Sequence, residues 1–302
     1  MPTKPSSPFE IYSIIKDLNP KKAPGYDQIT GKILQELPRK ALVFLSRLFN
    51  AIFRLQYFPE MWKAADVIMI AKPGKPGHEV TSYRPISLLP TLSKVFEKIL
   101  AKRLEPLLCE FDIIPQHQFG FRAQHATIEQ VHRIAHAIST ALEEKKYVSA
   151  VFLDVSQAFD KVWHTGLLYK IKNKIPQFYL LLKSYLENRR CRVKFQDEFS
   201  DWVNVSAGVP QGSVLGPMLY CIYTADLPMQ ENVITGTFAD DTAHIAVDDN
   251  KERASEILQR QLNTDEVWAE KWRTKFNASK STHVSFTLRS GDCPPVTLNN
   301  EQ

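Results

Sequence analysis

The stretch that most constrains the fold is Phe238-Ala239-Asp240-Asp241, in which two acidic residues are adjacent. Apolar residues lie on both sides, at 233–234 and 245–247, and the residues between them are small or compatible with a strand. This pattern predicts a tight β-hairpin with both acids at its turn. Adjacent carboxylates raise each other's pKa unless a cation lies between them, and Mg²⁺ prefers such oxygen ligands. The alternative is an ordinary polar hairpin tip, since Asp-Asp occurs in many turns.

A third acid, Asp154, follows the apolar run 148–153. The run predicts a buried strand, which puts Asp154 at the carboxyl end, where open sheets place their sites. The alternative is that Asp154 is the N-cap of a following helix. With Asp240 and Asp241 it supplies three carboxylates from two elements. That set suits two Mg²⁺ ions about 3.5–4 Å apart in a phosphoryl transfer.

Composition sets broad limits on the fold and the partners. The chain has 302 residues, of which 44% are hydrophobic, enough for one large domain or two small ones. The net charge of +5 is compatible with a nucleic-acid partner without requiring one. The four cysteines have no paired spacing, which argues against a disulfide framework or a zinc site. With no long apolar run and no signal peptide, we expect an intracellular protein without a membrane partner.

The apolar periodicity alternates between helical and strand patterns. Helices are expected at 8–18, 29–37, 39–58, 92–108, 126–145, 165–173, 176–188, 214–223 and 253–273. Strands are expected at 64–71, 83–86, 148–153, 190–196, 202–206 and 283–288, besides the acidic hairpin. Because helices and strands do not alternate strictly, the pattern favours an α+β fold over a parallel α/β one.

Two loops carry candidate nucleotide-binding residues. Lys72, Lys75 and Arg84 lie on a predicted basic hairpin and could hold a triphosphate, with Arg acting as a bidentate fork. The alternative is a solvated turn. The loop 208–213 could place backbone N–H groups and the Gln211 amide against a nucleotide or template. Its alternative is an ordinary helix entry.

Phe159 lies five positions after Asp154. An aromatic ring so close to a metal ligand could lie under the sugar of a bound nucleotide, where a 2′-hydroxyl would clash with it. Such a ring would select deoxyribose. A core phenylalanine is the alternative, and by composition alone it is the commoner case.

Six strings in this order resemble the reverse transcriptases of non-LTR (LINE-type) retrotransposons, closest to the jockey-like group. They are KAPGYDQI (22–29), SYRPISLLPTLSKVFEKIL (82–100), FGFRAQHAT (119–127), FLDVSQAFDKVWH (152–164), GVPQGSVLGPMLY (208–220) and TFADDTA (237–243). The resemblance implies the fingers and palm of a right-hand polymerase with an incomplete or absent thumb. It divides the chain into a helical fingers extension at 1–60, fingers at 61–147, palm at 148–290 and a truncated primer-grip or thumb segment at 291–302.

The resemblance also implies roles for individual residues. Asp154, Asp240 and Asp241 would bind the catalytic metals, assisted by the backbone carbonyl of Val155. The nucleotide would be contacted by Phe159 as sugar gate, by Gln211 near the template base, and by Lys72 and Arg84 on the triphosphate. Lys280 would protonate the leaving pyrophosphate, although Ser281 stands after it where the family usually has Thr.

The implied activity is RNA-directed DNA polymerisation with two Mg²⁺ ions, for which Mn²⁺ is a substitute. The implied partners are an RNA template, a DNA primer and dNTPs, and the implied location is the nucleus. Family proteins usually have an endonuclease before this domain and a thumb after it, so the sequence leads us to expect a truncated chain. Two alternatives remain: an inactive remnant that at most binds RNA, and an RNA-dependent RNA polymerase, against which Phe159 argues.

Overall fold

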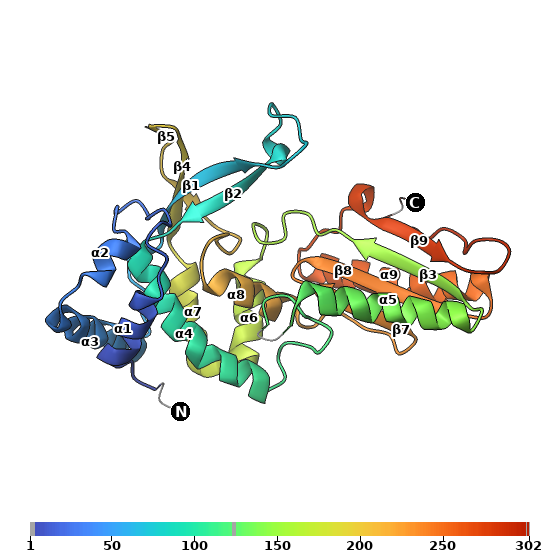
Figure 1. Ribbon diagram of the computed structural model, residues 1–302, viewed down its shortest axis with the longest axis horizontal. Coiled ribbons are helices and arrows are strands. Elements are labelled where there is room, and N and C mark those ends of the chain that lie inside the picture. The colour runs from blue at the N-terminus through green and yellow to red at the C-terminus, as the bar shows by residue number, and fades with distance from the viewer. Residues whose placement is uncertain (1–3, 123–124, 300, 302) are drawn as a thin grey trace. The chain divides into compact units, whose positions relative to one another are not determined.

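A computed structural model of the chain describes residues 4–122, 125–299 and 301. These residues form two compact units, and each is made from two separate parts of the chain (Figure 1). The first unit runs to Ile113 and resumes at His164–Leu219; the second comprises Ile114–Trp163 and everything from Tyr220 onward. Residues that are distant in sequence therefore meet within each unit.

The first unit combines helices with one mixed sheet. Its helices are α1 (Pro8–Lys16), α2 (Gly31–Gln35), α3 (Arg39–Leu55), α4 (Thr91–Glu110), α6 (His164–Lys174) and α7 (Tyr179–Leu186). Its strands are β1 (Ala64–Ala71), β2 (Tyr83–Leu88), β4 (Arg189–Phe195), β5 (Glu198–Phe199) and β6 (Val203–Val205). Strand β1 pairs antiparallel with β2 and parallel with β4, and β4 pairs antiparallel with both β5 and β6.

An aromatic cluster forms the core of the first unit. The Phe96 ring from α4 lies 5.3 Å from Phe49, 5.8 Å from Phe58 and 6.0 Å from Trp62, measured between ring centroids. Tyr185 of α7 packs edge-on against Phe58 at 4.9 Å. Edge-to-face packing at these distances is the preferred geometry of aromatic pairs. The cluster therefore joins three helices and the segment that leads into β1.

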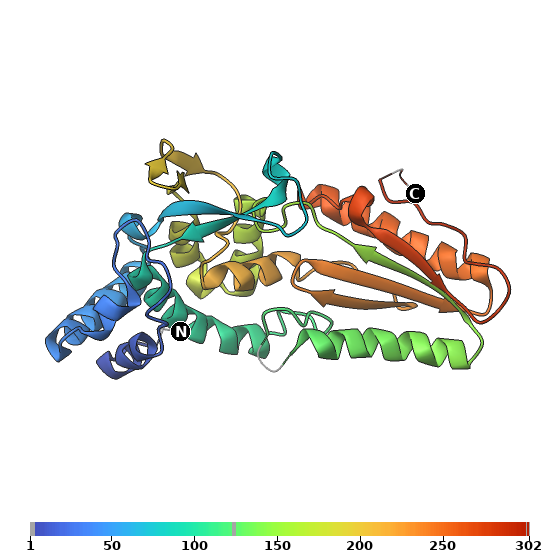
Figure 2. The same cartoon turned by 45° about the horizontal axis from the view of Figure 1, so that its top comes forward.

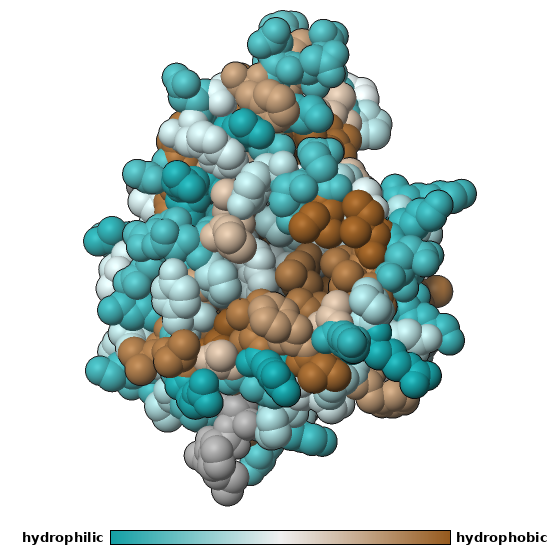
Figure 3. Space-filling model, turned by 90° about the vertical axis from the view of Figure 1, so that its left-hand side faces the viewer, coloured by the Kyte–Doolittle hydropathy of each residue, from teal (hydrophilic) through white to brown (hydrophobic). Residues whose placement is uncertain are grey.

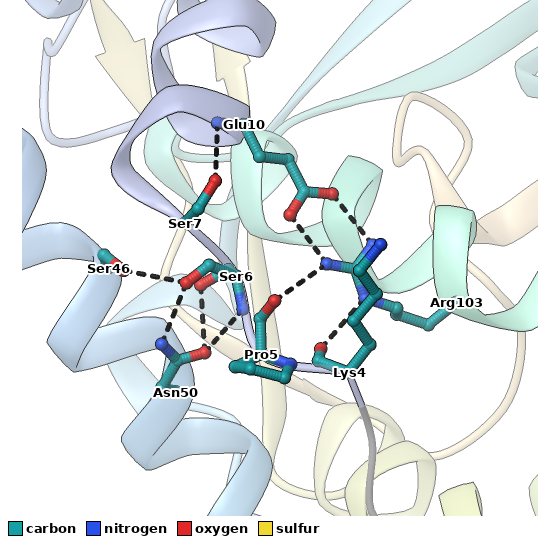
Figure 4. Close-up of polar contacts among 8 residues, drawn as sticks. All are labelled: Lys4, Pro5, Ser6, Ser7, Glu10, Ser46, Asn50 and Arg103. Carbon is teal, nitrogen blue, oxygen red and sulfur yellow. Dashed lines mark hydrogen bonds and ion pairs between the residues drawn. The ribbon is translucent and has the colours of Figure 1, made fainter.

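Hydrogen bonds fix the segment before α1 to α3 and α4 (Figure 4). Arg103 of α4 donates to both carboxylate oxygens of Glu10, at 2.8 and 2.6 Å, and also to the carbonyls of two residues that precede α1. The Ser6 N–H donates to Asn50 Oδ1 at 2.7 Å, and Ser46 donates to the Ser6 carbonyl. The Arg103 guanidinium lowers the pKa of Glu10 through this hydrogen bond. The N-terminal segment is therefore part of the folded unit.

Large apolar side chains are exposed on α1–α3 and around them. Figure 3 faces the end that carries these helices and shows apolar residues gathered among hydrophilic ones. The exposed apolar residues of this part of the chain are Phe9, Tyr12, Ile33, Val43, Phe44, Leu55, Tyr57 and Met61. Among the helices that the structure describes, none has both the length and the apolar character to cross a membrane.

The second unit is a four-stranded antiparallel sheet between two long helices (Figure 2). The strands, in sheet order, are β7 (Val233–Phe238), β8 (Asp241–Asp248), β3 (Tyr147–Leu153) and β9 (Thr282–Phe286). Helix α5 (Thr127–Glu143) covers one face through a cluster of Ala141, Val148, Ala150 and Ile245. Helix α9 (Lys251–Lys271) covers the other, and α8 (Leu215–Thr224) begins in the first unit and ends in the second.

A fully buried polar pair joins β8 to α9. His244 Nε2 lies 3.0 Å from Asp265 Oδ2, and both side chains have no exposed surface. Thr235 Oγ1 lies 2.9 Å from the other ring nitrogen of His244, and Gln261 donates to the other Asp265 oxygen at 2.8 Å. Because an unpaired polar group is costly in a low dielectric, the network favours one position of the hairpin against the helix.

We expect Asp265→Ala to lower the free energy of unfolding by about 1–3 kcal/mol, because it removes the acceptor of the buried Gln261 amide and leaves the His244 imidazole without its neighbour. Urea denaturation at neutral pH measures the change. Glu270→Ala, at an exposed position of the same helix, is the matched control and should change stability by less than about 0.5 kcal/mol. Equal effects of the two substitutions would show that the pair does not stabilise the fold.

Most sequence expectations for the elements are confirmed. The strand at 64–71, the acidic hairpin and the α+β architecture are as predicted. Several boundaries are wrong: the first helix ends at Lys16, the second spans only Gly31–Gln35, the third ends at Leu55, and the 176–188 helix starts as a 3-10 turn at Pro176–Phe178. Strand β5 is an element that the sequence did not predict. The Ser7 hydroxyl caps α1, and Glu10 pairs with Arg103. The division at 60, 147 and 290 stays a prediction; residues 1–3, 123–124, 300 and 302 of those segments lie outside the described residues.

Candidate active site

The three predicted acids lie at the ends of neighbouring strands. Strands β3 and β8 pair as far as Leu153 and Thr242, and the next residue toward that end of the sheet is Asp154 on one strand and Asp241 on the other. The turn between β7 and β8 consists of Ala239 and Asp240. Asp154 does not cap a helix, since the next one begins ten residues later at His164. The structure therefore brings the three acids together at one edge of the sheet.

The acids are close enough to affect one another's charge. The pKa of Asp241 is raised, first by partial burial, then by the negative charge of Asp240 and then by that of Asp154. A bound cation would relieve this repulsion. Among the described residues, no three His, Cys, Asp or Glu side chains are grouped tightly enough to hold one metal ion by themselves.

The segment after α9 holds the backbone of Asp154. The Asp154 N–H donates to the Ser281 hydroxyl at 3.1 Å, and the Asn277 N–H donates to the Asp154 carbonyl at 2.8 Å. Val155 forms a β-bridge with Phe276. The predicted donor Lys280 places Nζ 3.8 Å from Asp154 Oδ2, with 58% of its side chain exposed. The Ser281 hydroxyl thus has a structural role that the sequence did not show.

A glutamine that the sequence analysis missed holds the acidic turn. Gln118 Oε1 accepts from the N–H groups of Ala239, at 3.0 Å, and Gly120, at 2.7 Å. Its Nε2 donates to the Ala239 carbonyl at 3.2 Å. Ala239 has a φ of +59°, a left-handed conformation that costs energy for a residue with a side chain. These bonds stabilise the conformation that places Asp240 at the turn.

Gly120 allows this close approach because it has no side chain. A Cβ at Gly120 would lie 2.0 Å from the Ala239 nitrogen and 2.7 Å from its Cα. Both are backbone atoms, so a clash can be relieved only by moving the acidic turn or the 117–120 segment. The Phe119–Arg122 stretch stood out in the sequence, but nothing in it showed which backbone Gly120 would meet.

We expect Gly120→Ala to lower the free energy of unfolding by about 1–3 kcal/mol and to displace the acidic turn. Denaturation measures the first effect, and faster amide exchange at residues 238–241 reports the second. Gly77→Ala is the control, because its Cβ would meet only the Tyr83 hydroxyl, at an ordinary 3.6 Å. Exchange that stays unchanged at the turn would show that the contact with Gly120 does not position it.

Phe159 belongs to an aromatic group near the acids. Its ring stacks on Tyr220 at 4.8 Å between centroids and meets Phe121 edge-on at 6.0 Å. Burial, and after it the charge of Asp240, raises the pKa of the Tyr220 hydroxyl. Phe159 is half-buried, so its ring is not enclosed in the core. The structure therefore places Phe159 one aromatic ring away from the acidic turn.

The predicted phosphate-binding residues belong to the first unit. Arg84 is an exposed residue of β2, whereas Lys72 Nζ donates to the Thr81 carbonyl of its own hairpin at 2.8 Å. The Gln211 carbonyl accepts from the Ser87 N–H at 2.7 Å, which attaches the 208–213 loop to β2. The structure thus groups Lys72, Arg84 and Gln211 in one unit, and their convergence with the acids on one nucleotide stays a prediction.

A buried carboxylate fixes the other end of this loop. Glu97 of α4 has no exposed surface and accepts from the N–H groups of Val214 and Leu215, at 2.9 and 3.1 Å, where α8 begins. Burial raises the pKa of Glu97, and these N–H groups oppose the rise. The sequence placed Glu97 within a matching string but did not show this contact. The contact with Glu97 therefore attaches the start of α8, the helix that follows Gln211, to α4 and its aromatic cluster.

Comparison with known proteins identifies the family. Residues 70–297 match the family described as reverse transcriptase (RNA-dependent DNA polymerase), and this range includes every predicted site residue. The chain belongs to the reverse transcriptase family. Divalent metal dependence is general in this family.

Two curated relatives from Drosophila melanogaster confirm the resemblance to jockey-like elements. The chain is 47% identical over 302 residues to a probable RNA-directed DNA polymerase from transposon X-element, across 98% of this chain and 33% of the relative. It is 44% identical to the RNA-directed DNA polymerase from mobile element jockey, across 96% of this chain and 33% of the relative. The chain thus spans about a third of the length of these relatives.

A solved structure shares the fold. Apo telomerase from Candida tropicalis, truncated from its C-terminal domain, superposes with a TM-score of 0.54 and 14% identity, covering 84% of this chain and 57% of that one. At this identity the likeness concerns the fold alone. It supports the polymerase fold, with fingers and palm, that the sequence led us to expect.

Proposed function

We propose that this chain is the reverse transcriptase region of a non-LTR retrotransposon and extends a DNA primer on an RNA template with dNTPs, in the nucleus. The observation that carries the proposal is the placement of Asp154 and Asp241 at the paired ends of β3 and β8, with Asp240 in the adjoining turn. This arrangement lies within the range that matches the family. The names of the relatives support the same reaction.

The donor set fits Mg²⁺. Carboxylate and carbonyl oxygens are its preferred ligands, and Mg²⁺ commonly takes only one or two protein carboxylates beside water and substrate phosphates. A site that holds no ready three-ligand cluster is consistent with this mode of binding. We propose that Asp154, Asp240, Asp241 and the Val155 carbonyl hold two Mg²⁺ ions, with Mn²⁺ as a substitute. When bound, such ions lower the pKa of the primer hydroxyl and stabilise charge on the phosphates.

The chain's own residues would orient the reacting groups. The primer 3′-oxygen bonds to the α-phosphorus and loses its proton to water, while the bond to the β-phosphate breaks and pyrophosphate leaves. Lys280, beside Asp154, would give the leaving group a proton. Arg84 and Lys72 would neutralise the triphosphate, and Gln211 would lie against the incoming nucleotide and template base.

Primer extension by the purified chain tests this proposal. With an RNA template, a DNA primer and Mg²⁺, we expect extension that falls about 100- to 1,000-fold in Asp154→Asn and Asp240→Asn, because each substitution removes a carboxylate ligand. Asp249→Asn, at an exposed position after β8, should keep the parent rate.

Another result would favour the alternative function. A folded parent chain that binds RNA but extends no primer in Mg²⁺ or Mn²⁺ would identify the chain as an inactive remnant. Extension that survives Asp240→Asn unchanged would show that the acidic turn is not the reaction centre.

Phe159→Val tests the substrate class. If the ring packs beneath C2′ of the nucleotide, its removal should raise NTP incorporation about 5- to 100-fold, in line with the energy of relieved overpacking, and leave dNTP use largely intact. The measurement is the ratio of dNTP to NTP incorporation, with Phe111→Val at an exposed end of α4 as control. A variant that discriminates as well as the parent would make Phe159 a packing residue only.

A further inference from the structure

Cations and aromatic rings alternate along one face of β4 and its neighbours β5 and β6. From one end to the other, the order is Arg190, Trp202, Arg192, Phe199 and Lys194. The Trp202 ring centroid lies 5.7 Å from the charged group of Arg190 and 4.7 Å from that of Arg192. The Phe199 centroid lies 3.9 Å from Arg192 and 5.5 Å from Lys194. We name these five residues the β4 ladder. The Tyr26 ring meets the Trp202 ring edge-on, with 6.0 Å between the ring centroids, and this contact orients the Trp202 ring.

Strand register explains why the cations share one face. Arg190, Arg192 and Lys194 are alternate residues of a strand, so their side chains point to the same side about 7 Å apart. Residues paired across neighbouring strands point to the same face of a sheet. Lys194 pairs with Ile68 of β1. Ile70, two residues further along β1 and on the same face, pairs with Arg84 of β2. The face that carries the β4 ladder therefore also carries Arg84, one of the residues predicted to bind a triphosphate.

Little of the positive charge on this face is neutralised. Arg192 Nε donates to Asp66 Oδ1 at 2.7 Å. Among the described residues, neither Arg190 nor Lys194 has an ion pair, and Asn204, not an acid, lies opposite Arg190. A hairpin stabilised only by its own contacts would gain from acids at these cross-strand positions. The ladder instead leaves two cations available to an anionic partner.

The two rings are also partly exposed. Phe199 keeps 44% and Trp202 38% of its surface exposed, although both are large apolar side chains. Rings of this kind, interleaved with Arg and Lys, bind single-stranded nucleic acids, since every base has a face that can stack and every nucleotide has a phosphate. Bases of a duplex are already stacked and paired, so a duplex cannot use the rings.

We propose that the β4 ladder binds single-stranded RNA, with Arg190 and Lys194 moving off the rings to hold phosphates and bases taking their places on Trp202 and Phe199. The inference deepens the proposed function, because under it the bound strand is the RNA template before it is copied. It is distinguishable from that function, because strand binding needs none of the three carboxylates. An acidic peptide could satisfy the cations but has no use for the two rings.

Fluorescence anisotropy with a labelled 20-nucleotide single-stranded RNA tests the inference, using the full chain without primer or dNTPs so that no extension occurs. Trp202→Leu and Phe199→Leu should each weaken binding about 5- to 100-fold, the loss of one stacked base. Arg190→Gln and Lys194→Gln should each reduce the slope of log affinity against log salt by about 0.7. A duplex of the same sequence should bind the parent less tightly.

Matched controls separate the β4 ladder from the general surface. Phe195→Leu removes an exposed ring from the opposite face of the same strand, and Lys40→Gln removes an exposed cation from α3; neither should change RNA affinity by more than about twofold. Trp202→Phe keeps a ring and should bind within about threefold of the parent, even if Trp202→Leu does not fold.

Three results would overturn the inference. They are an unchanged RNA affinity in folded Phe199→Leu and Lys194→Gln variants, equal binding of duplex and single strand, and displacement of the RNA by a poly-glutamate peptide with no sensitivity to the ring substitutions. In each case the rings would only pack against the arginines. Failure of primer extension with intact, ladder-dependent RNA binding would reject the proposed reaction and leave this inference standing.

Discussion

The candidate site depends on the antiparallel register between β3 and β8. That register places Leu153 opposite Thr242, so Asp154 and Asp241, the adjoining residue on each strand, lie at the same end of the sheet. A slip of one residue would turn every side chain of β8 to the other face. It would move Ile245 out of the α5 core and His244 away from Asp265, at the cost of a buried unpaired carboxylate. Burial on both faces of the sheet therefore fixes the position of two carboxylates at its end.

The contacts that surround the acids are made mostly to backbone. Gln118 bonds to both polar backbone groups of Ala239, and the Ser281 hydroxyl and the Asn277 N–H bond to the N–H and C=O of Asp154. Such contacts orient the backbone that carries Asp154 and Asp240. A site that has to bind cations gains from a supported backbone, because its ligands have to be held close to one geometry.

The sequence predicts the acids of the site better than it predicts the residues that hold the backbone around them. Asp154 and the acidic turn could be located because a buried strand and a tight hairpin are local patterns. Gln118 and Glu97 could not, because they contact Ala239 and Val214, which lie more than 100 residues away. No local periodicity predicts which distant backbone a side chain will meet. The sequence shows Arg190 and Arg192 only as nearby cations, since their alternation with Trp202 and Phe199 depends on how three short strands pair.

The two units carry opposite kinds of charged group for the proposed reaction. The second contains the three carboxylates, and the first contains Arg84 and the β4 ladder, whose cations we propose to bind phosphates. Phosphate-binding cations on the same strand ends as the acids would pair with them directly and compete with a metal. Lys280 is the cation that the structure does place beside Asp154. It lies 3.8 Å away with more than half of its side chain exposed, a geometry in which an ion pair is weak. Its ammonium can therefore turn toward a phosphate without first breaking a strong contact.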